Sequence, residues 1–163
     1  MTTFKVPQPP RGWKAIPWRL PIWFYRLGLG GLLGERFLLL THTGRVSGMP
    51  RQAVVEVVYH DAGTNSYYVA SGFGERSQWY RNILANPQVT VQVGKRVMAA
   101  RAERLPVAEG ERRLAEYAHR HPTALRELSR LLKLPYDGSP ESLRKLAELL
   151  PVVAFHCEGE EPA

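Results

Sequence analysis

One short segment holds the residues best suited to bind an anion. It runs from Thr41 to Arg51 with the sequence Thr-His-Thr-Gly-Arg-Val-Ser-Gly-Met-Pro-Arg. Its glycines allow backbone N–H groups to point toward one place, where together they bind an anion. The hydroxyl groups of Thr43 and Ser47 and the guanidinium groups of Arg45 and Arg51 add donors that suit phosphate oxygens. The segment therefore indicates a phosphate-binding loop, with a glycine-rich strand connection bearing solvated arginines as an equal alternative.

A second candidate lies where a predicted strand opens into a loop before a predicted helix. The chain there reads Val69-Ala-Ser-Gly-Phe-Gly74, and Ser77-Gln-Trp-Tyr-Arg-Asn82 follows. The N-terminus of a helix offers unpaired N–H groups to the polar edge of a ligand. Trp79 and Tyr80 are suited to stack on a flat ring, although a core tryptophan that holds the helix to the sheet explains Trp79 at least as well.

No other residues form a pattern with recognised chemistry. The anion loop matches neither the Walker P-loop nor the dinucleotide-binding G-x-G-x-x-G motif. His119 and His121 are too sparse for a metal site. His42, His60 and His156 have no acid at the spacing of a catalytic triad. The sequence therefore assigns no catalytic residue and no metal.

The positive charge of the chain is unevenly placed. The formal net charge is +7, and residues 1–52 account for all of it, with eight Lys and Arg against one acid. Such asymmetry suggests a phosphate-bearing ligand, nucleic acid or an anionic membrane. The basic region contains no recognised nucleic-acid motif, and its aromatic residues lie among leucines. We therefore expect no nucleic-acid partner.

Residues 13–34 contain three of the four tryptophans, together with leucines and arginines. This mixture suits a membrane interface, which makes a peripheral membrane contact one interpretation. The favoured interpretation is a segment that covers the core with Trp and Leu side chains. The single cysteine, Cys157, excludes an intramolecular disulfide, and no apolar run approaches the about 20 residues of a membrane-spanning helix. These features predict a cytoplasmic protein, with the inner membrane face as an alternative position.

The hydrophobic pattern predicts a barrel with helical covers. Apolar runs bounded by turn residues predict six strands, over 37–41, 51–60, 67–70, 89–93, 96–102 and 151–155. Helical spacing and N-terminal Ser or Pro residues predict helices over 78–85, 108–120, 123–134 and 141–150. Short connections between strands are typical of a closed or half-closed antiparallel barrel. The predicted fold class is mainly β with helices, with 1–34 as a covering segment and 35–163 as the barrel domain.

Three segments, taken in order, carry a family resemblance. Leu39 to Arg51, Trp79 to Pro87 and Val91 to Gly94 resemble the deazaflavin-dependent nitroreductase family. The resemblance implies a split β-barrel like that of FMN-binding proteins. It also implies an oxidoreductase that binds coenzyme F420, an 8-hydroxy-5-deazaflavin with a phosphate and an oligoglutamate tail. Members pass a hydride between this cofactor and a small electron-poor acceptor such as a quinone or a nitro compound.

The resemblance also implies cofactor-binding residues in four segments. The phosphate-and-tail loop corresponds to Arg45, Val46, Ser47 and Gly48. The strand that flanks the cofactor corresponds to Arg51, Gln52, Ala53, Val54 and Val55. The strand beside the deazaflavin ring corresponds to Val69, Ala70, Ser71 and Gly72, and the helix start that closes over the cofactor to Gln78, Trp79, Tyr80, Arg81 and Asn82. Backbone N–H groups near Ser71 and Gly72 would polarise the ring, and 13–34 with the helices after Leu105 would line the acceptor pocket.

Some residues depart from the family pattern. Val46 stands where many members have lysine, so one cationic contact to the anionic tail is missing, and Gly72 stands where the best-known member has lysine. Tyrosines that line the acceptor side in that member fall near His121, Ala124 and Glu127, so its nitroimidazole-type activity is not implied. Because the tail-binding lysine is absent at Val46, FMN or haem remains an alternative ligand. A non-catalytic membrane-surface or lipid-binding protein that uses residues 13–34 is the hypothesis from another class.

Overall fold

The strands and helices follow the predicted order along the chain. A computed structural model describes residues 36–72, 74–131 and 133–158, so the predicted covering segment 1–34 lies outside the described residues. The strands are β1 (Phe37–Thr43), β2 (Pro50–Asp61), β3 (Ser66–Ala70), β4 (Gln88–Val93), β5 (Arg96–Arg104) and β6 (Val152–Cys157). The helices are the short 3-10 helix η3 (Gly74–Arg76), α2 (Gln78–Ala85), α3 (Val107–Arg120), α4 (Pro122–Leu131) and α5 (Pro140–Leu149). All six predicted strands and all four predicted helices are therefore confirmed.

The six strands close into an antiparallel barrel in the order β1-β2-β3-β6-β5-β4. The barrel closes where β1 pairs with β4, with Leu40 opposite Val91. The last strand, β6, lies between β3 and β5, so that Phe155 pairs with Tyr67 on one side and Ala102 on the other. Alternate residues of each strand point into the barrel, as the burial pattern of β4 shows. The core is therefore built from all six strands.

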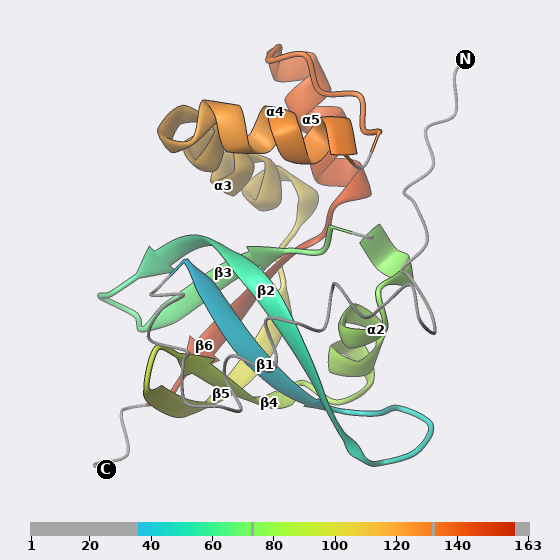
Figure 1. The fold of residues 1–163 in the computed structure, drawn as a ribbon, viewed down its shortest axis with the longest axis vertical. Coiled ribbons are helices and arrows are strands. Elements are labelled where there is room, and N and C mark those ends of the chain that lie inside the picture. The colour runs from blue at the N-terminus through green and yellow to red at the C-terminus, as the bar shows by residue number, and fades with distance from the viewer. Residues whose placement is uncertain (1–35, 73, 132, 159–163) are drawn as a thin grey trace.

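The helices occupy two places around the barrel (Figure 1). Tyr80 and Ile83 of α2 belong to the barrel core, and the ring of Trp79 lies 6.3 Å from that of Phe155. Helices α3, α4 and α5 gather at the top of the view, beyond β2 and β3. The guanidinium group of Arg113 on α3 lies 4.7 Å from the ring centroid of Tyr59 and 4.5 Å from that of Tyr68. This cation–π contact attaches α3 to the outer face of β2 and β3.

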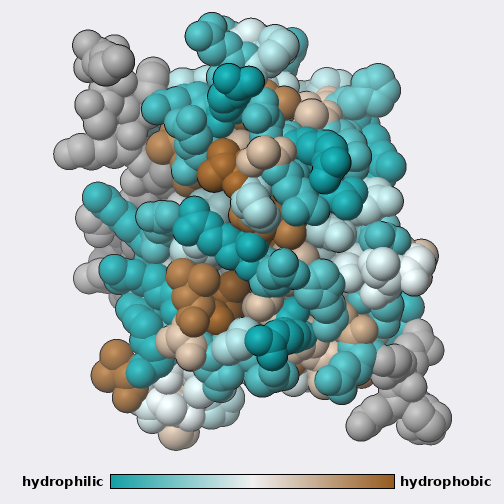
Figure 2. Space-filling view, turned by 180° about the vertical axis from the view of Figure 1, so that it is seen from behind, coloured by the Kyte–Doolittle hydropathy of each residue, from teal (hydrophilic) through white to brown (hydrophobic). Residues whose placement is uncertain are grey.

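The exposed apolar side chains belong to different elements. Figure 2 shows hydrophobic patches separated by hydrophilic side chains on the face seen from behind. Among the described residues, the large apolar side chains with the greatest exposure are Val46 and Met49, both in the β1–β2 loop, and Leu84, Val97, Val107 and Leu131, each on another element. Isolated apolar side chains of this kind are ordinary on protein surfaces.

The helix predicted over 123–134 ends three residues early, at Leu131. The N–H of Leu134 donates to the carbonyl oxygen of Ser129 (2.7 Å), and the N–H of Lys133 donates to that of Arg130 (3.2 Å). Lys133 has a φ of 53°, in the left-handed region. These are the two hydrogen bonds of a Schellman motif, which ends a helix, and Pro135 follows it. Sequence periodicity missed the end because lysine, not glycine, occupies the left-handed position.

Replacing this lysine by glycine is expected to stabilise the protein. Lys133→Gly removes the steric cost of a left-handed backbone in a residue with a Cβ atom, and we expect the free energy of unfolding to rise by about 0.5 kcal/mol. Urea denaturation measures the change. Lys145→Gly, inside α5, is the matched control and is expected to lower stability by about 1 kcal/mol. Equal destabilisation by both substitutions would contradict the helix end described here.

Candidate functional site

The predicted phosphate loop is the tip of the hairpin between β1 and β2. The N–H of Gly44 donates to the carbonyl oxygen of Met49 (2.8 Å), and the N–H of Gly48 donates to that of Gly44 (2.9 Å). The Met49 N–H donates to Ser47 Oγ (3.2 Å). Gly48 has a φ of 70°, where glycine is strongly favoured. The loop thus holds its own shape and leaves Arg45, Ser47 and Arg51 exposed.

This internal bonding changes which groups are available to an anion. The glycines of this segment predicted backbone N–H groups that point at the ligand. Instead, the N–H groups of Gly44, Gly48 and Met49 bond within the loop, and that of Arg45 bonds to α2. Side-chain guanidinium and hydroxyl groups are therefore the main donors that the loop offers.

Arg45 attaches the loop to α2. Its backbone N–H donates to Asn82 Oδ1 (3.1 Å), and its Nη1 donates to the same oxygen (2.8 Å). Its Nη2 donates to Gln78 Oε1 (2.9 Å). Three residues predicted to bind the cofactor from two distant segments thus lie in direct contact. A guanidinium has five N–H donors, and these bonds use two of them, so the group retains donors for an anion.

Asn82 makes a further contact with His42, which the sequence analysis left without a role. Asn82 Nδ2 lies 3.1 Å from His42 Nδ1. His42 is 5% exposed, and burial first, then the positive charge of Arg51, lowers the pKa of His42 to about 4. The imidazole is therefore neutral near pH 7 and accepts the hydrogen bond. Its alternation with the buried Leu38 and Leu40 was a sequence signal that His42 points into the barrel.

The predicted residues of β2 and β3 divide between the surface and the core. Arg51 is exposed, and Gln52, Ala53 and Val54 are partly buried. The side chains of Val55 and Val69 belong to the barrel core, at 8% and 0% exposure. These two valines therefore support the strands from inside rather than present side chains to a ligand.

Ser71 uses both of its donors within the protein. Its N–H donates to the carbonyl oxygen of Pro151 (2.9 Å), and its Oγ donates to that of Gly74 (2.6 Å). Of the backbone N–H groups near Ser71 and Gly72 that were expected to polarise a cofactor ring, that of Ser71 is therefore already occupied by strand-end bonding. Ser71 instead fixes the loop that leads from β3 to α2.

The first turns of α2 present both polar and aromatic side chains. Gln78 and Arg81 are exposed, and Trp79 is partly buried against the core. Ser77 is at the N-cap as predicted, but its side chain makes no capping hydrogen bond. Tyr80 is 1% exposed, and within 36–72, 74–131 and 133–158 its hydroxyl has no hydrogen-bond partner. Burial raises the pKa of this hydroxyl, with the nearby Arg104 opposing the shift.

A hydrogen-bonded pair of residues that links the barrel to the helical layer was also not predicted from the sequence. The hydroxyl of Tyr117 on α3 donates to Glu56 Oε1 on β2 (2.6 Å), and Arg36 Nε lies 3.4 Å from the same oxygen. Burial first, then the hydrogen bond to Glu56, raises the pKa of Tyr117. Glu56 directly follows the predicted cofactor-flanking residues on β2. No sequence signal pairs two residues so far apart.

Tyr117→Phe is expected to lower the free energy of unfolding by about 1–2 kcal/mol near pH 7, because it removes a hydrogen bond to a charged group. A raised pKa in the folded state means that folding favours the protonated hydroxyl. This part of the stability is present below the ordinary tyrosine pKa of about 10 and is lost as the pH rises through the folded-state value. Denaturation at pH 7 to 11 should therefore show a steeper alkaline loss in the wild type than in Tyr117→Phe.

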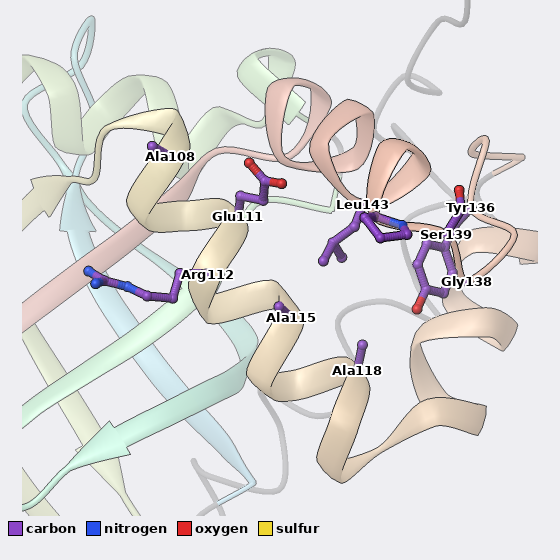
Figure 3. A pocket seen from close by; sticks show the side chains of 10 residues that line it. Ala108, Glu111, Arg112, Ala115, Ala118, Tyr136, Gly138, Ser139 and Leu143 are labelled. Atoms are coloured by element: carbon purple, nitrogen blue, oxygen red, sulfur yellow. The ribbon is translucent and has the colours of Figure 1, made fainter.

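A groove lies apart from these residues, between α3 and α5 (Figure 3). Its volume is about 510 Å³, and Ala115, Tyr136 and Leu143 are among the residues that line it. None of the predicted cofactor-binding residues lines this groove. It is therefore a feature of the helical layer, separate from the residues assigned to the cofactor.

The described part of the chain, residues 36–72, 74–131 and 133–158, contains neither a metal cluster nor a membrane-spanning helix. No group of three or more His, Cys, Asp or Glu residues there is arranged to hold a metal ion. Among the same residues, no helix has both the length and the apolar character needed to cross a membrane.

The closed antiparallel barrel with its helical cover is a split β-barrel. A solved structure described as an F420-H2 dependent reductase (FDR-A) has the same fold, with a TM-score of 0.50, 24% identity and coverage of 75% of this chain and 95% of that chain. Protein Atu2129 of Agrobacterium tumefaciens, of unknown function, is 17% identical with a TM-score of 0.55, over 95% of this chain and 60% of that chain. These likenesses establish the fold class.

The sequence identifies the family within this class. Residues 19–127 match the family described as F420H(2)-dependent quinone reductase, and the chain belongs to it. The predicted resemblance to deazaflavin-dependent oxidoreductases is thereby confirmed. A Mycobacterium tuberculosis protein named "Putative F420H(2)-dependent quinone reductase Rv3178" is 39% identical over 71 residues. That match covers 42% of this chain and 58% of the relative, so it spans less than two thirds of the relative's length.

Proposed function

We propose that this protein binds coenzyme F420 and transfers a hydride between the deazaflavin and a quinone-type acceptor. The observation that carries the proposal is the contact between the hairpin loop and α2. Arg45, Asn82 and Gln78 come from two of the segments that the family resemblance assigns to the cofactor, and they form one hydrogen-bonded group. Membership of a family named for F420H(2) supports the same cofactor.

The chemistry of the loop fits the anionic part of this cofactor. Arg45, Ser47 and Arg51 are exposed on one turn, so two cationic groups and a hydroxyl are available to a phosphate and a carboxylate tail. A Cβ atom at Gly44 would lie 2.7 Å from Ser47 Oγ, so the Ser47 hydroxyl would have to move from its present position. We assign the phosphate and the first part of the tail to these residues. Val46 supplies no charge there, so Arg51 takes a larger share of the tail contact.

The remaining assigned residues position the ring and keep water away. When bound, the reduced deazaflavin supplies the hydride, and the protein does not have to provide an acid–base pair. The partly buried surface of Ala53, Val54 and Ala70 offers an apolar wall. Trp79 closes the α2 side, and the buried Tyr80 hydroxyl, which has no hydrogen-bond partner among the described residues, is suited to bond a water or a polar ligand group.

We also propose the finer features predicted from the sequence. The acceptor is a small quinone, with nitro compounds as a second acceptor class. The protein works in the cytoplasm, and a peripheral contact of residues 13–34 with the inner face of the membrane is the alternative to their favoured role as a cover of the core. Co-sedimentation with anionic vesicles tests this contact. Trp18→Ala and Trp23→Ala together should reduce it, and unchanged co-sedimentation would contradict it.

The cofactor assignment is tested by titrating the purified protein with coenzyme F420 and, separately, with FMN and haem. We expect saturable binding of F420, followed by fluorescence, with at least tenfold weaker binding of FMN. The expected preference arises because the loop offers several donors to the longer anionic tail. If FMN or haem bound more tightly than F420, that ligand would be assigned as the cofactor in place of F420. Indifference to all three ligands would remove the oxidoreductase proposal.

A further inference from the structure

We propose that His42 is a positioning residue for the cofactor's anionic tail: its neutral imidazole fixes the orientation of the Asn82 side-chain amide, and Asn82 in turn holds Arg45 in the phosphate loop. This inference rests on the proposed function for its effect on cofactor binding. The underlying contact is a property of the free protein and is tested separately.

The amide of Asn82 has an acceptor on one side and a donor on the other, so its orientation decides what each neighbour meets. In the structure, Oδ1 faces two donors of Arg45, the backbone N–H at 3.1 Å and Nη1 at 2.8 Å. Nδ2 faces His42 Nδ1 at 3.1 Å. In the reverse orientation, the NH₂ group would meet both donors of Arg45. The two neighbours therefore favour the same orientation.

The role of His42 depends on its being an acceptor. Nδ1 accepts only when the imidazole is neutral and carries its proton on Nε2. Burial at the end of β1, with the positive charge of Arg51 as the second cause, lowers the pKa of His42 to about 4 and keeps it neutral at physiological pH. The positively charged group that acts on it, Arg51, lies opposite His42 on β2, whereas α2 contributes the neutral Asn82.

Burial explains why the Asn82 amide needs this partner. Asn82 is 4% exposed and His42 is 5% exposed, so solvent does not replace a lost hydrogen bond easily. Buried polar groups without a partner are unfavourable, and a side chain so placed rotates to find one. Without His42, the buried Nδ2 of Asn82 would lack a partner, and any movement of the side chain that brings it to another acceptor would draw Oδ1 away from Arg45. Because only Thr43 and Gly44 separate His42 from Arg45, the effect reaches the loop directly.

Three variants and two ligands test the effect on binding. The ligands are coenzyme F420 and the same deazaflavin without its phosphate and oligoglutamate tail. We expect His42→Leu to weaken F420 binding about tenfold and to leave binding of the truncated deazaflavin unchanged. His42→Asn, which offers an oxygen acceptor near the position of Nδ1, should restore F420 affinity to within about twofold. His60→Leu, near the far end of β2, is the matched control and should change neither affinity.

A double-mutant cycle identifies the route of the effect. If His42 acts through Arg45, His42→Leu should cause no further loss of F420 affinity in the Arg45→Ala background. If the losses of F420 affinity from the two substitutions were additive, His42 would not act through Arg45. Equal weakening of the binding of both ligands by His42→Leu would also contradict this route.

Hydrogen exchange of the Arg45 backbone N–H tests the contact without any cofactor. We expect exchange in the folded protein to become about tenfold faster in His42→Leu and to stay slow in His42→Asn. Unchanged exchange in His42→Leu would overturn the positioning role, whatever ligand the protein binds. If the two variants show these exchange rates but the wild-type protein binds no F420, the proposed function would be overturned and the His42 contact would remain supported.

Discussion

Arg45→Ala is expected to weaken the binding of coenzyme F420 about 100-fold, the largest loss of affinity among single substitutions in the hairpin loop. The substitution removes a charge-assisted contact to an anion, which typically contributes about 1.5–3 kcal/mol. It also removes the two guanidinium hydrogen bonds that attach the loop to α2. Fluorescence titration measures the dissociation constant, and thermal denaturation shows whether the fold is retained.

Two further variants separate charge from geometry at this position. Arg45→Lys keeps the charge but loses the planar fork that reaches Asn82 and Gln78, so we expect it to recover only part of the affinity. Arg112→Ala, an exposed arginine at the groove in α3, is the matched control and should bind F420 as the wild type does. If Arg45→Ala bound F420 as tightly as the control, the phosphate of the cofactor would not bind at Arg45.

Acidification is expected to destabilise the wild type much more than a variant that lacks the buried imidazole. The pKa of His42 is about 4 in the folded protein, against about 6.5 for an ordinary histidine, so the unfolded chain binds the proton more tightly. The stabilising effect of a neutral His42 is complete above pH 6.5 and is lost as the pH falls toward 4. The linkage relation gives a loss of about 3 kcal/mol across this range.

Urea denaturation at several pH values between 4 and 8 tests this prediction in wild type and His42→Asn. The difference in the free energy of unfolding between the two should change by about 3 kcal/mol with pH. Carboxylates titrate in the same range, but they are common to both proteins and cancel in the difference. Parallel pH profiles would show that His42 does not stay neutral in the folded state.

The barrel was predictable because its strands alternate and its turns are short. Val89 to Val93 and Arg96 to Ala102 follow the rules for a hairpin, and the structure pairs them through the Gly94–Lys95 turn. The position of β6 between β3 and β5 is different, since it depends on pairing between segments far apart in the chain. Local patterns predict that a strand exists but not which strands lie beside it.

The site was predictable in its segments but not in its contacts. The family resemblance brought Arg45 and Asn82 into one set of residues. Their direct hydrogen bonds depend on how α2 crosses the end of the barrel, and this crossing is a tertiary feature. His42 was overlooked because a lone histidine in an apolar strand has no motif. Val55 and Val69 were included by position, although the pleat of each strand directs their side chains to the core.

The order of the strands has a consequence for how the protein is made. Val152–Cys157 completes the sheet on both sides, so during synthesis β3 and β5 are finished long before the strand that separates them exists. Until then each has an unpaired edge, which other chains can join. The barrel therefore closes only after residue 157 has left the ribosome. A stalled or truncated chain that lacks β6 is expected to be a substrate for chaperones and proteases, not a shortened version of the fold.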